Sequence, residues 1–311
     1  MEPRPWTARD AALLGLTIVA WGTNYLFVRV GLSSAGPLWL SALRASAGAG
    51  ALGAYFLFAR PPSRLTPRER GLALLVGIPN TAGLLGFWFV AAASVPPGQT
   101  AVVIYTYPLW VALLSVPLLS LRLGVGHWAA IVGGFAGVTL VSQPWAGGHA
   151  AIPTLALGEL IAAAVCWSVA TVLVQRLFRR EALPAANGYQ MLAGAGVLLL
   201  LAVVFEGSAL PRFTPSLTVA VLWMGVYGTA FAYAVWFFLL GKVPAPTLSA
   251  YAFLVPIVAL GASAVFLGER LDAEQAIGVV LVLLSIYGIS RASARPRPSG
   301  SPPGAPAVRS D

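Results

Sequence analysis

Long apolar runs alternate with short polar segments along the whole chain. Each run extends for about 20 residues, and a helix of that length crosses about 30 Å of hydrocarbon. The pattern therefore predicts an all-α polytopic membrane protein with ten transmembrane helices. We expect these helices at residues 11–30, 37–59, 71–93, 98–118, 125–142, 156–177, 187–206, 216–240, 245–267 and 275–291.

The two ends of the chain differ from the apolar runs. Residues 1–10 place Arg4 and Arg9 ahead of the first run, as in a signal peptide or a first transmembrane helix. The run is too long for a signal peptide and no small-residue cleavage site follows it, so we expect a helix after a short cytoplasmic segment. The Pro-, Ser- and Gly-rich residues 292–311 are expected to form a disordered cytoplasmic tail.

Composition argues against a soluble fold. Hydrophobic residues make up 58% of the chain and charged residues only 9%, whereas a soluble domain carries about 25% charged residues. The mean hydropathy is +0.82. So few charges cannot cover a water-exposed surface, and the lipid bilayer is the expected surrounding of the chain.

The distribution of positive charge predicts the orientation. The net charge of +9 could suggest a nucleic-acid ligand, but the arginines lie in short loops and tails beside apolar runs. Fifteen Lys and Arg residues fall on the side of the two termini, and only Arg212 and Arg270 on the other. Because cytoplasmic loops carry the positive excess, we expect both termini in the cytoplasm and no nucleic-acid partner.

The chain also contains an internal repeat. Adding 148 to each position from Gly77 to Leu123 gives a gap-free correspondence with the second half, and an offset of 146 pairs Trp21 with Trp167. The matched positions are Gly77 with Gly225, Thr81 with Thr229, Ala82 with Ala230, Trp88 with Trp236, Phe89 with Phe237, Val95-Pro96 with Val243-Pro244, Pro108 with Pro256, Ser115 with Ser263, and Arg122-Leu123 with Arg270-Leu271.

Each half contains five predicted helices. Because five is odd, the second half must begin on the opposite face of the membrane, so residues 11–143 and 156–291 are predicted to be inverted repeats. Residues 144–155 are the expected extracytoplasmic linker between them. Transporters of this design hold the substrate near the midplane between the repeats.

Four stretches carry a resemblance to a known family. They are WGTNYLFVR (21–29), PLWLSALR (37–44), the Val-Pro start of the fourth predicted helix with Pro108 inside it, and PIVALGASAVFLGERL (256–271). With the ten helices in two repeats, they make residues 11–291 resemble the EamA-type exporters of the drug/metabolite transporter superfamily. The resemblance implies export of small metabolites through a central cavity lined by the first, third, fourth, sixth, eighth and ninth helices. The first half departs from the pattern, because SLRL (120–123) lacks the acidic residue that Glu269 supplies in the second.

A polar face interrupts the first apolar run. Trp21, Asn24, Tyr25 and Val28 follow the spacing i, i+3, i+4, i+7 and share one side of a helix. Polar groups are costly in hydrocarbon, so we expect this face to point between the repeats, where Asn24 can hydrogen-bond to a substrate. The alternative is an interhelical bond that only holds the bundle together. Arg29 lies near the outer end of this helix, where its long side chain can reach water.

The other substrate-binding candidates are polar or aromatic residues predicted inside the spans. A buried tyrosine needs a partner for its hydroxyl, and Pro79 places a kink beside an amide and a hydroxyl. Trp6, Trp128 and Trp145 are instead expected in the interfacial aromatic belt. The complete set of substrate-binding candidates is Trp21, Asn24, Tyr25, Asn80, Thr81, Tyr105, Tyr107, Trp167, Tyr227 and Tyr251.

Arg44 requires a partner or a water-filled pocket, because it is predicted roughly 10 Å inside the second helix. Apart from Glu206 at the last position of the span 187–206, Glu159 is the one acidic residue that falls inside a predicted span. We therefore expect an ion pair between Arg44 and Glu159, as a structural clamp or an outer gate, with Arg29 as the alternative cation.

Proline and glycine suggest hinges and contacts. Pro108 and Pro256 are repeat mates inside predicted helices, where each removes a helix hydrogen bond, so we expect them to act as hinges. Gly133 and Gly137 form a GxxxG motif. Such a motif can dimerise a protein, but we expect packing within the bundle and a monomer, with a dimer as the alternative.

The sequence offers little for catalysis. Cys166 is the only cysteine and His127 and His149 are isolated, so we expect no metal, no cofactor and no enzyme. An intramembrane enzyme would need a nucleophile with a base, or a metal cluster, at matching depth. No Asp or Glu falls at predicted mid-depth, which favours exchange, facilitated efflux or coupling through the substrate's own charge over coupling through a protein carboxylate.

The predicted function is secondary transport. We expect export of small amphipathic metabolites, with neutral or aromatic amino acids first among them, by alternating access through a central cavity. An aromatic cavity can also hold a lipophilic cation, so a multidrug or quaternary-cation exporter is the alternative within this class. A non-transporting membrane scaffold or receptor is the alternative from another class.

Overall fold

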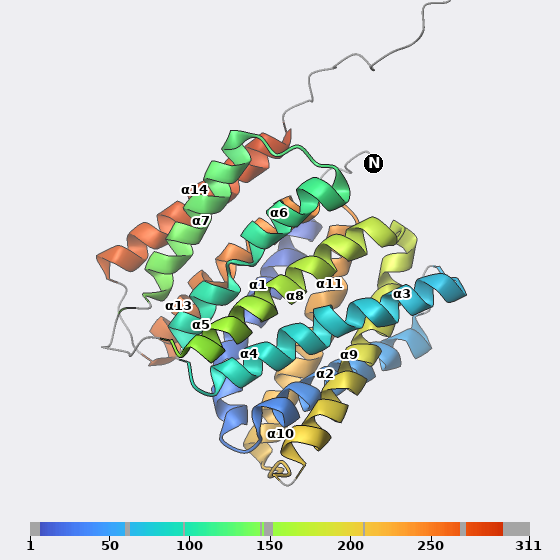
Figure 1. Ribbon diagram of the computed structural model, residues 1–311. Coiled ribbons are helices and arrows are strands. Elements are labelled where there is room, and N and C mark those ends of the chain that lie inside the picture. Colours follow the sequence, from blue (N-terminus) through green and yellow to red (C-terminus); the bar gives the residue numbers. More distant parts are fainter. Residues whose placement is uncertain are drawn as a thin grey trace, which may run out of the picture.

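The computed structural model describes residues 7–59, 63–95, 97–143, 145, 152–207, 209–267 and 272–294. Within these ranges the chain forms ten helical stretches and no strand, which confirms the predicted all-α fold (Figure 1). The first five stretches are α1 (Ala8–Leu32), α2 (Pro37–Phe58), α3 with α4 (Pro67–Gly77 and Leu84–Ala92), α5 with α6 (Pro97–Ile104 and Tyr107–Leu119) and α7 (Val125–Ser142). The second five are α8 (Thr154–Leu177), α9 (Leu183–Glu206), α10 with α11 (Pro215–Leu222 and Ala232–Leu240), α12 with α13 (Ala245–Ala250 and Leu254–Leu267) and α14 (Ala273–Ala294).

Length and apolarity make the chain a multi-pass membrane protein. Eight of the helical stretches are long and apolar enough to cross a membrane, and Ala273–Ile289 of α14 forms a shorter apolar helix. The stretch that differs is α2, which is rich in Gly, Ala and Ser. Small residues allow close approach of helix backbones, and α2 packs closely against α9 and against the segment Trp223–Phe231.

Several predictions lie outside the described residues. These are the predicted tail from residue 295 onward, most of the predicted linker 144–155, and the acidic position Glu269 with its neighbour Arg270. Residues 1–6 and Pro96 also fall outside them.

Both repeats contain interrupted helices at matching positions. The π-helical segment Ile78–Gly83 joins α3 to α4, and the π-helical segment Trp223–Phe231 joins α10 to α11. A turn at residues 105–106 separates α5 from α6, and the 3₁₀ turn Tyr251–Phe253 separates α12 from α13. Pro108 and Pro256 lie in the first turn of the helices that follow these last two breaks, α6 and α13. Their hinge role stays a prediction.

Small residues fix the contact between the repeats in two matching places. A side chain at Gly48 of α2 would meet Thr229 Cγ2 at 2.7 Å and the Gly225 carbonyl oxygen at 3.0 Å. Its repeat mate, Gly194 of α9, lies against Thr81 and Gly77. The same offsets of 146 and 148 that pair the sequences therefore also pair these contacts, as the inverted repeat requires.

The helices α7 and α14 lie side by side at one edge of the bundle (Figure 1). Their backbones touch where Gly137 meets Gly278, since a Cβ at Gly137 would lie 2.8 Å from the Gly278 carbonyl oxygen. Gly133 of the same GxxxG motif faces open space. The motif therefore provides a contact within the bundle through one of its two glycines.

The contact at Gly137 can be tested with a matched pair of substitutions. Gly137→Ala should lower the unfolding temperature, because the added methyl group meets backbone, at a cost of roughly 1 to 3 kcal/mol. Gly133→Ala makes the same change in helix propensity on an open face and should not lower it. Thermal unfolding of both purified variants measures the difference. Equal losses in the two variants would contradict the assigned contact.

Candidate functional site

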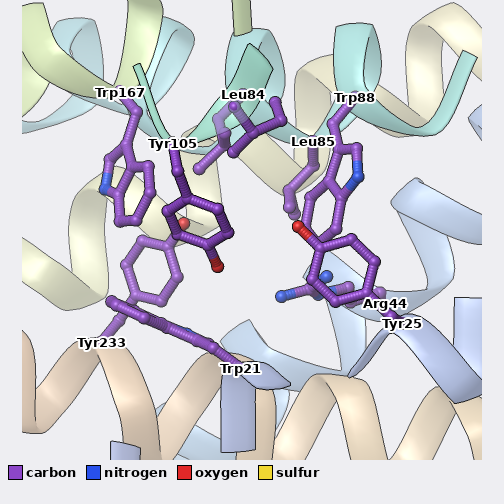
Figure 2. A pocket seen from close by; sticks show the side chains of 10 residues that line it. Trp21, Tyr25, Arg44, Leu84, Leu85, Trp88, Tyr105, Trp167 and Tyr233 are labelled. Atoms are coloured by element: carbon purple, nitrogen blue, oxygen red, sulfur yellow. The ribbon is translucent and has the colours of Figure 1, made fainter. Parts of the chain in front are cut away.

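A central cavity lies between the two repeats, with a volume of about 30 Å³. Helices from both halves of the chain contribute to its wall, as Figure 2 shows. The lining residues are Trp21, Tyr25, Arg44, Leu84, Leu85, Trp88, Ile104, Tyr105, Trp167 and Tyr233. Its wall is thus mainly aromatic and aliphatic, with one charged residue among the described lining residues.

Repeat-related tryptophans meet at this cavity. The rings of Trp21 and Trp167 lie edge to face with their centroids 5.3 Å apart. Trp21 also packs against Trp236 at 4.9 Å, and Trp167 stacks on Tyr107 at 3.7 Å. Edge-to-face and offset-stacked geometries are the favourable ones for aromatic rings. The cluster therefore provides a rigid wall on which a flat apolar group can rest.

Arg44 reaches the cavity from α2 and is only 1% exposed. Its Nε donates to Thr229 Oγ1 at 2.9 Å, and its Nη2 donates to the Gly228 carbonyl oxygen at 3.4 Å. With the Asn24 amide oriented to satisfy its neighbours, Asn24 Oδ1 also accepts from Arg44 Nη2 at 3.2 Å. The guanidinium is thus held by groups on α1 and on the Trp223–Phe231 segment.

The charge of Arg44 has no anionic partner among the described residues. Nη1 has no hydrogen-bond partner, and the guanidinium carbon lies 5.4 Å from the Trp88 ring centroid and 5.6 Å from that of Phe89. The two ion pairs formed by described residues join Arg179 to Glu69 and Lys242 to Asp10. A buried cation without an anionic partner is costly, so the neutral acceptors and aromatic faces around Arg44 compensate its charge only in part.

The expected ion pair between Arg44 and Glu159 is not formed in this structure. The Arg44 side chain points to Thr229 and Gly228 in the second repeat, whereas Glu159 lies half-buried in the second turn of α8. The prediction rested on Glu159 being, apart from Glu206 at the end of a span, the one acid inside a predicted span. Neutral acceptors and aromatic faces surround the guanidinium instead.

The second repeat contains an uncharged counterpart of the Arg44 contact. An offset of 146 places Gln190 of α9 at the position of Arg44, and an offset of 148 places Thr229 at that of Thr81. Thr81 Oγ1 donates to Gln190 Oε1 at 2.8 Å. The same helix contact therefore exists twice, but only one copy carries a charge, and only that copy reaches the cavity.

A second, larger cavity of about 330 Å³ adjoins the central one at the end of the bundle where α1 and α4 terminate. We call it the vestibule. Its lining includes Val28, Arg29 and Thr100, and it shares Tyr25 and Trp88 with the central cavity. The Tyr25 and Trp88 rings, 5.5 Å apart, form the boundary between the two spaces. A volume of this size lies in the range that holds small ligands.

At the opposite end of the bundle, an ion pair and several hydrogen bonds connect the helices. Lys242 Nζ donates to Asp10 Oδ1 at 2.6 Å, and Asp10 is 1% exposed. Gln175 of α8 donates through Nε2 to the Leu240 and Val243 carbonyl oxygens and accepts from the Ala245 N–H. These bonds connect the start of α1, the end of α8 and the turn between α11 and α12.

The structure places part of the predicted set at the cavity. Four substrate-binding candidates line it, namely Trp21, Tyr25, Tyr105 and Trp167. Asn24 lies one hydrogen bond away, through Arg44. The others lie elsewhere: Asn80 and Thr81 sit in the π-helical segment beside α9, the Tyr107 hydroxyl is hydrogen-bonded to Thr171, the Tyr227 hydroxyl donates to the Leu16 carbonyl oxygen, and Tyr251 begins the 3₁₀ turn before α13.

Sequence reasoning did not single out several lining residues, chiefly Trp88, Tyr233 and Leu85. A signal for them existed in the repeat. The offset of 148 pairs Leu85 with Tyr233, and both line the cavity, as do the mates Trp21 and Trp167. Inverted repeats present matching positions to one central space, so the mate of a lining residue is itself a candidate.

Comparison with known proteins identifies one family. The EamA-like transporter family matches residues 11–143 and 155–291. The uncharacterized transporter YvbV of Bacillus subtilis is 25% identical, with 92% of each chain covered. Proteins named "Probable amino-acid metabolite efflux pump" from Salmonella typhimurium and Escherichia coli are 28% and 26% identical, each comparison covering 90% of this chain and 94% of the relative. A solved crystal structure shares the fold with a TM-score of 0.77 at 23% identity, covering 93% of this chain and 98% of the other.

The two repeat-related contacts predict unequal losses of stability. Thr229→Val removes an acceptor from the Arg44 guanidinium and should cost roughly 2 to 3 kcal/mol of unfolding free energy. Thr81→Val removes a donor from the neutral Gln190 amide and should cost about 1 kcal/mol. Unfolding of both variants in detergent measures the two values. A larger loss for Thr81→Val would contradict the charged character assigned to the Arg44 contact.

Proposed function

The chain belongs to the EamA-like transporter family, and on this basis we propose that it exports small amphipathic metabolites, with neutral or aromatic amino acids first among them. We place it in a bacterial inner membrane with both termini in the cytoplasm. The names of the Salmonella and Escherichia relatives, which describe amino-acid metabolite efflux, support this substrate class.

The aromatic central cavity is the observation that carries the proposal. Aromatic rings from both repeats surround one space, and polar atoms of Tyr25, Tyr105 and Arg44 face into it (Figure 2). An apolar side chain would gain about 25 cal/mol for each Å² of apolar surface that it buries between these rings. A wall with few polar groups suits a solute with an apolar body and one polar end.

Alternating access accounts for the difference between the two ends of the bundle. The vestibule opens toward the ends of α1 and α4, which the charge distribution places outside the cell. The other end is closed by the Asp10–Lys242 ion pair and the Gln175 hydrogen bonds. This arrangement corresponds to a state that is closed toward the cytoplasm and in which the Tyr25–Trp88 boundary still separates the central cavity from the outer vestibule.

We propose that transport is not coupled to an ion bound by a carboxylate of the protein, and that the substrate's own gradient or charge drives it. None of the described residues lining the central cavity is acidic, so the cavity lacks the carboxylate that many proton- or sodium-coupled carriers place at mid-depth. Exchange or facilitated efflux fits this cavity best. The alternative of a quaternary-cation exporter is disfavoured because Arg44 would repel the ligand. A counterflow assay distinguishes a transporter from a non-transporting scaffold or receptor.

Counterflow of phenylalanine tests the proposed function. Proteoliposomes loaded with unlabelled phenylalanine should accumulate labelled phenylalanine faster than liposomes without the protein do. Trp21→Leu removes a ring from the cavity wall and should lower the rate about tenfold, the loss expected from about 1.4 kcal/mol of substrate contact. Trp128→Leu changes a half-buried tryptophan on the peripheral helix α7 and serves as the matched control, expected to retain the rate.

Two results would count against this reading. Wild-type protein that is folded yet produces no accumulation would reject phenylalanine as a substrate. Equal rates in Trp21→Leu and wild type would keep the transporter and remove the aromatic cavity from its path.

The ion pair at the closed end predicts a change in conformation. Lys242→Gln leaves the buried Asp10 carboxylate unpaired and should destabilise the closed end by roughly 1 to 3 kcal/mol. Spin labels are attached to cysteines introduced at Ala11 and Pro244 in a Cys166→Ala background. The distribution of distances between the two labels should then show an added population at longer distance. The matched control is Arg179→Gln, because Arg179 is 62% exposed and its ion pair with Glu69 is weak in water. An unchanged distance distribution in Lys242→Gln would remove the pair from the gate.

A further inference from the structure

We propose that Arg44 binds the carboxylate of the substrate, and that the site selects amphipathic monocarboxylates without requiring an amine. This inference rests on the proposed function and narrows its substrate class. Phenylalanine would then be accepted through its carboxylate, and deaminated or N-acylated counterparts of aromatic amino acids should bind at least as well.

The first argument is the unused hydrogen-bonding capacity of Arg44. Its Nε and Nη2 are held by Thr229, Gly228 and Asn24, which fixes the plane of the guanidinium. Its Nη1 has no partner although the side chain is 99% buried, and the residue lines the central cavity. A guanidinium fixed on one edge and free on the other is preorganised to donate to a carboxylate oxygen.

A second donor lies beside it. Tyr25 Oη is buried, it lies near the Tyr105 hydroxyl, and it makes no hydrogen bond of standard geometry, so its proton is available to a ligand in the cavity that both tyrosines line. Figure 2 shows the Tyr25 hydroxyl and the Arg44 guanidinium facing the same space. A carboxylate has two oxygens, so one can accept from Arg44 Nη1 and the other from Tyr25 Oη.

The charge of the site decides the chemical class of the ligand. Arg44 is the one charged side chain among the described residues of the cavity wall, and its protein partners there are neutral. A monoanion would neutralise it in an environment that excludes water, where a charge-assisted hydrogen bond is strong. An ammonium group would meet a like charge and no acidic partner.

The repeat limits the site to one carboxylate. Gln190 stands at the position of Arg44 in the second repeat, is engaged by Thr81, and does not line the cavity. The apolar body of the ligand then lies against Trp21 and Trp167. Because the central volume of about 30 Å³ holds only a group of about the size of one water molecule, the Tyr25–Trp88 boundary must open to join it to the vestibule.

Three compounds with one ring and one chain length test the inference. They are 3-phenylpropionate, 3-phenylpropionamide and 3-phenylpropylamine, which differ in the charge of the head group. Their binding to the purified full chain is followed by tryptophan fluorescence, since three tryptophans line the cavity. Wild-type protein should bind the propionate at least about tenfold more tightly than the amide or the amine. Equal or tighter binding of the amide or the amine would overturn the inference.

Variants assign the preference to Arg44. Arg44→Gln should abolish the preference for the propionate, and Arg44→Lys should retain part of it, since lysine keeps the charge without the fixed fork. Arg179→Gln is the matched control, because Arg179 lines neither cavity and its side chain is 62% exposed, and this variant should retain the preference in full. Loss of the preference in Arg29→Gln, with full retention in Arg44→Gln, would assign it to the rim of the vestibule and overturn the inference. If Arg44→Gln does not fold, the wild-type series and Arg44→Lys still decide.

The inference and the proposed function can fail separately. Wild-type protein that prefers the propionate but shows no phenylalanine counterflow supports the carboxylate site and rejects phenylalanine as an exported substrate. Wild-type protein that exchanges phenylalanine but binds the three compounds equally supports export and rejects the role of Arg44.

Discussion

One carbonyl group connects the two halves of the molecule at the cavity. The Gly228 carbonyl oxygen accepts from Trp21 Nε1 at 3.1 Å and from Arg44 Nη2 at 3.4 Å. It lies in the π-helical segment Trp223–Phe231, whose wider turn offers backbone groups to partners outside the helix. The absence of a side chain at Gly228 lets Asn24 pack directly on the backbone. The positions of the tryptophan wall and of the guanidinium therefore both depend on this one turn.

The two repeats share a backbone plan but differ in chemistry. Both have a π-helical segment in their third helix, a break in the fourth and a glycine contact between repeats. At the matched positions, however, the residue types differ. Arg44 corresponds to Gln190, Asn24 to Ala170 and Tyr25 to Thr171. Polar groups that serve the cavity are concentrated in the first repeat. The two repeats therefore provide similar backbones, and their different side chains make the cavity between them more polar on the side of the first repeat.

The sequence was sufficient to predict the helices, because each span depends on local apolarity, and the repeat, because its landmarks recur at fixed offsets. Four cavity residues were also predicted: Trp21 and Tyr25 from their spacing on one helix face, Tyr105 from its place near the middle of a predicted span, and Trp167 as the repeat mate of Trp21. The partner of Arg44 was not. Its hydrogen bonds end on Thr229 and on a backbone carbonyl, and a backbone acceptor leaves no signal in the residue pattern. The π-helical segments were missed for a similar reason, since they are defined by hydrogen-bond spacing and only Pro79 marks one of them in sequence.

The bonds around Gln175 determine where the closed end of the bundle can separate. Three hydrogen bonds fasten the turn between α11 and α12 to α8, so these helices form one stiff body. The start of α1 is joined to that body by the contact of Asp10 with Lys242. Because α1 also packs against α11 and α13, separating its start from that body would break side-chain contacts as well as this ion pair. The backbone hydrogen bonds within each helix take no part in these contacts, so such a movement of α1 would need no local unfolding.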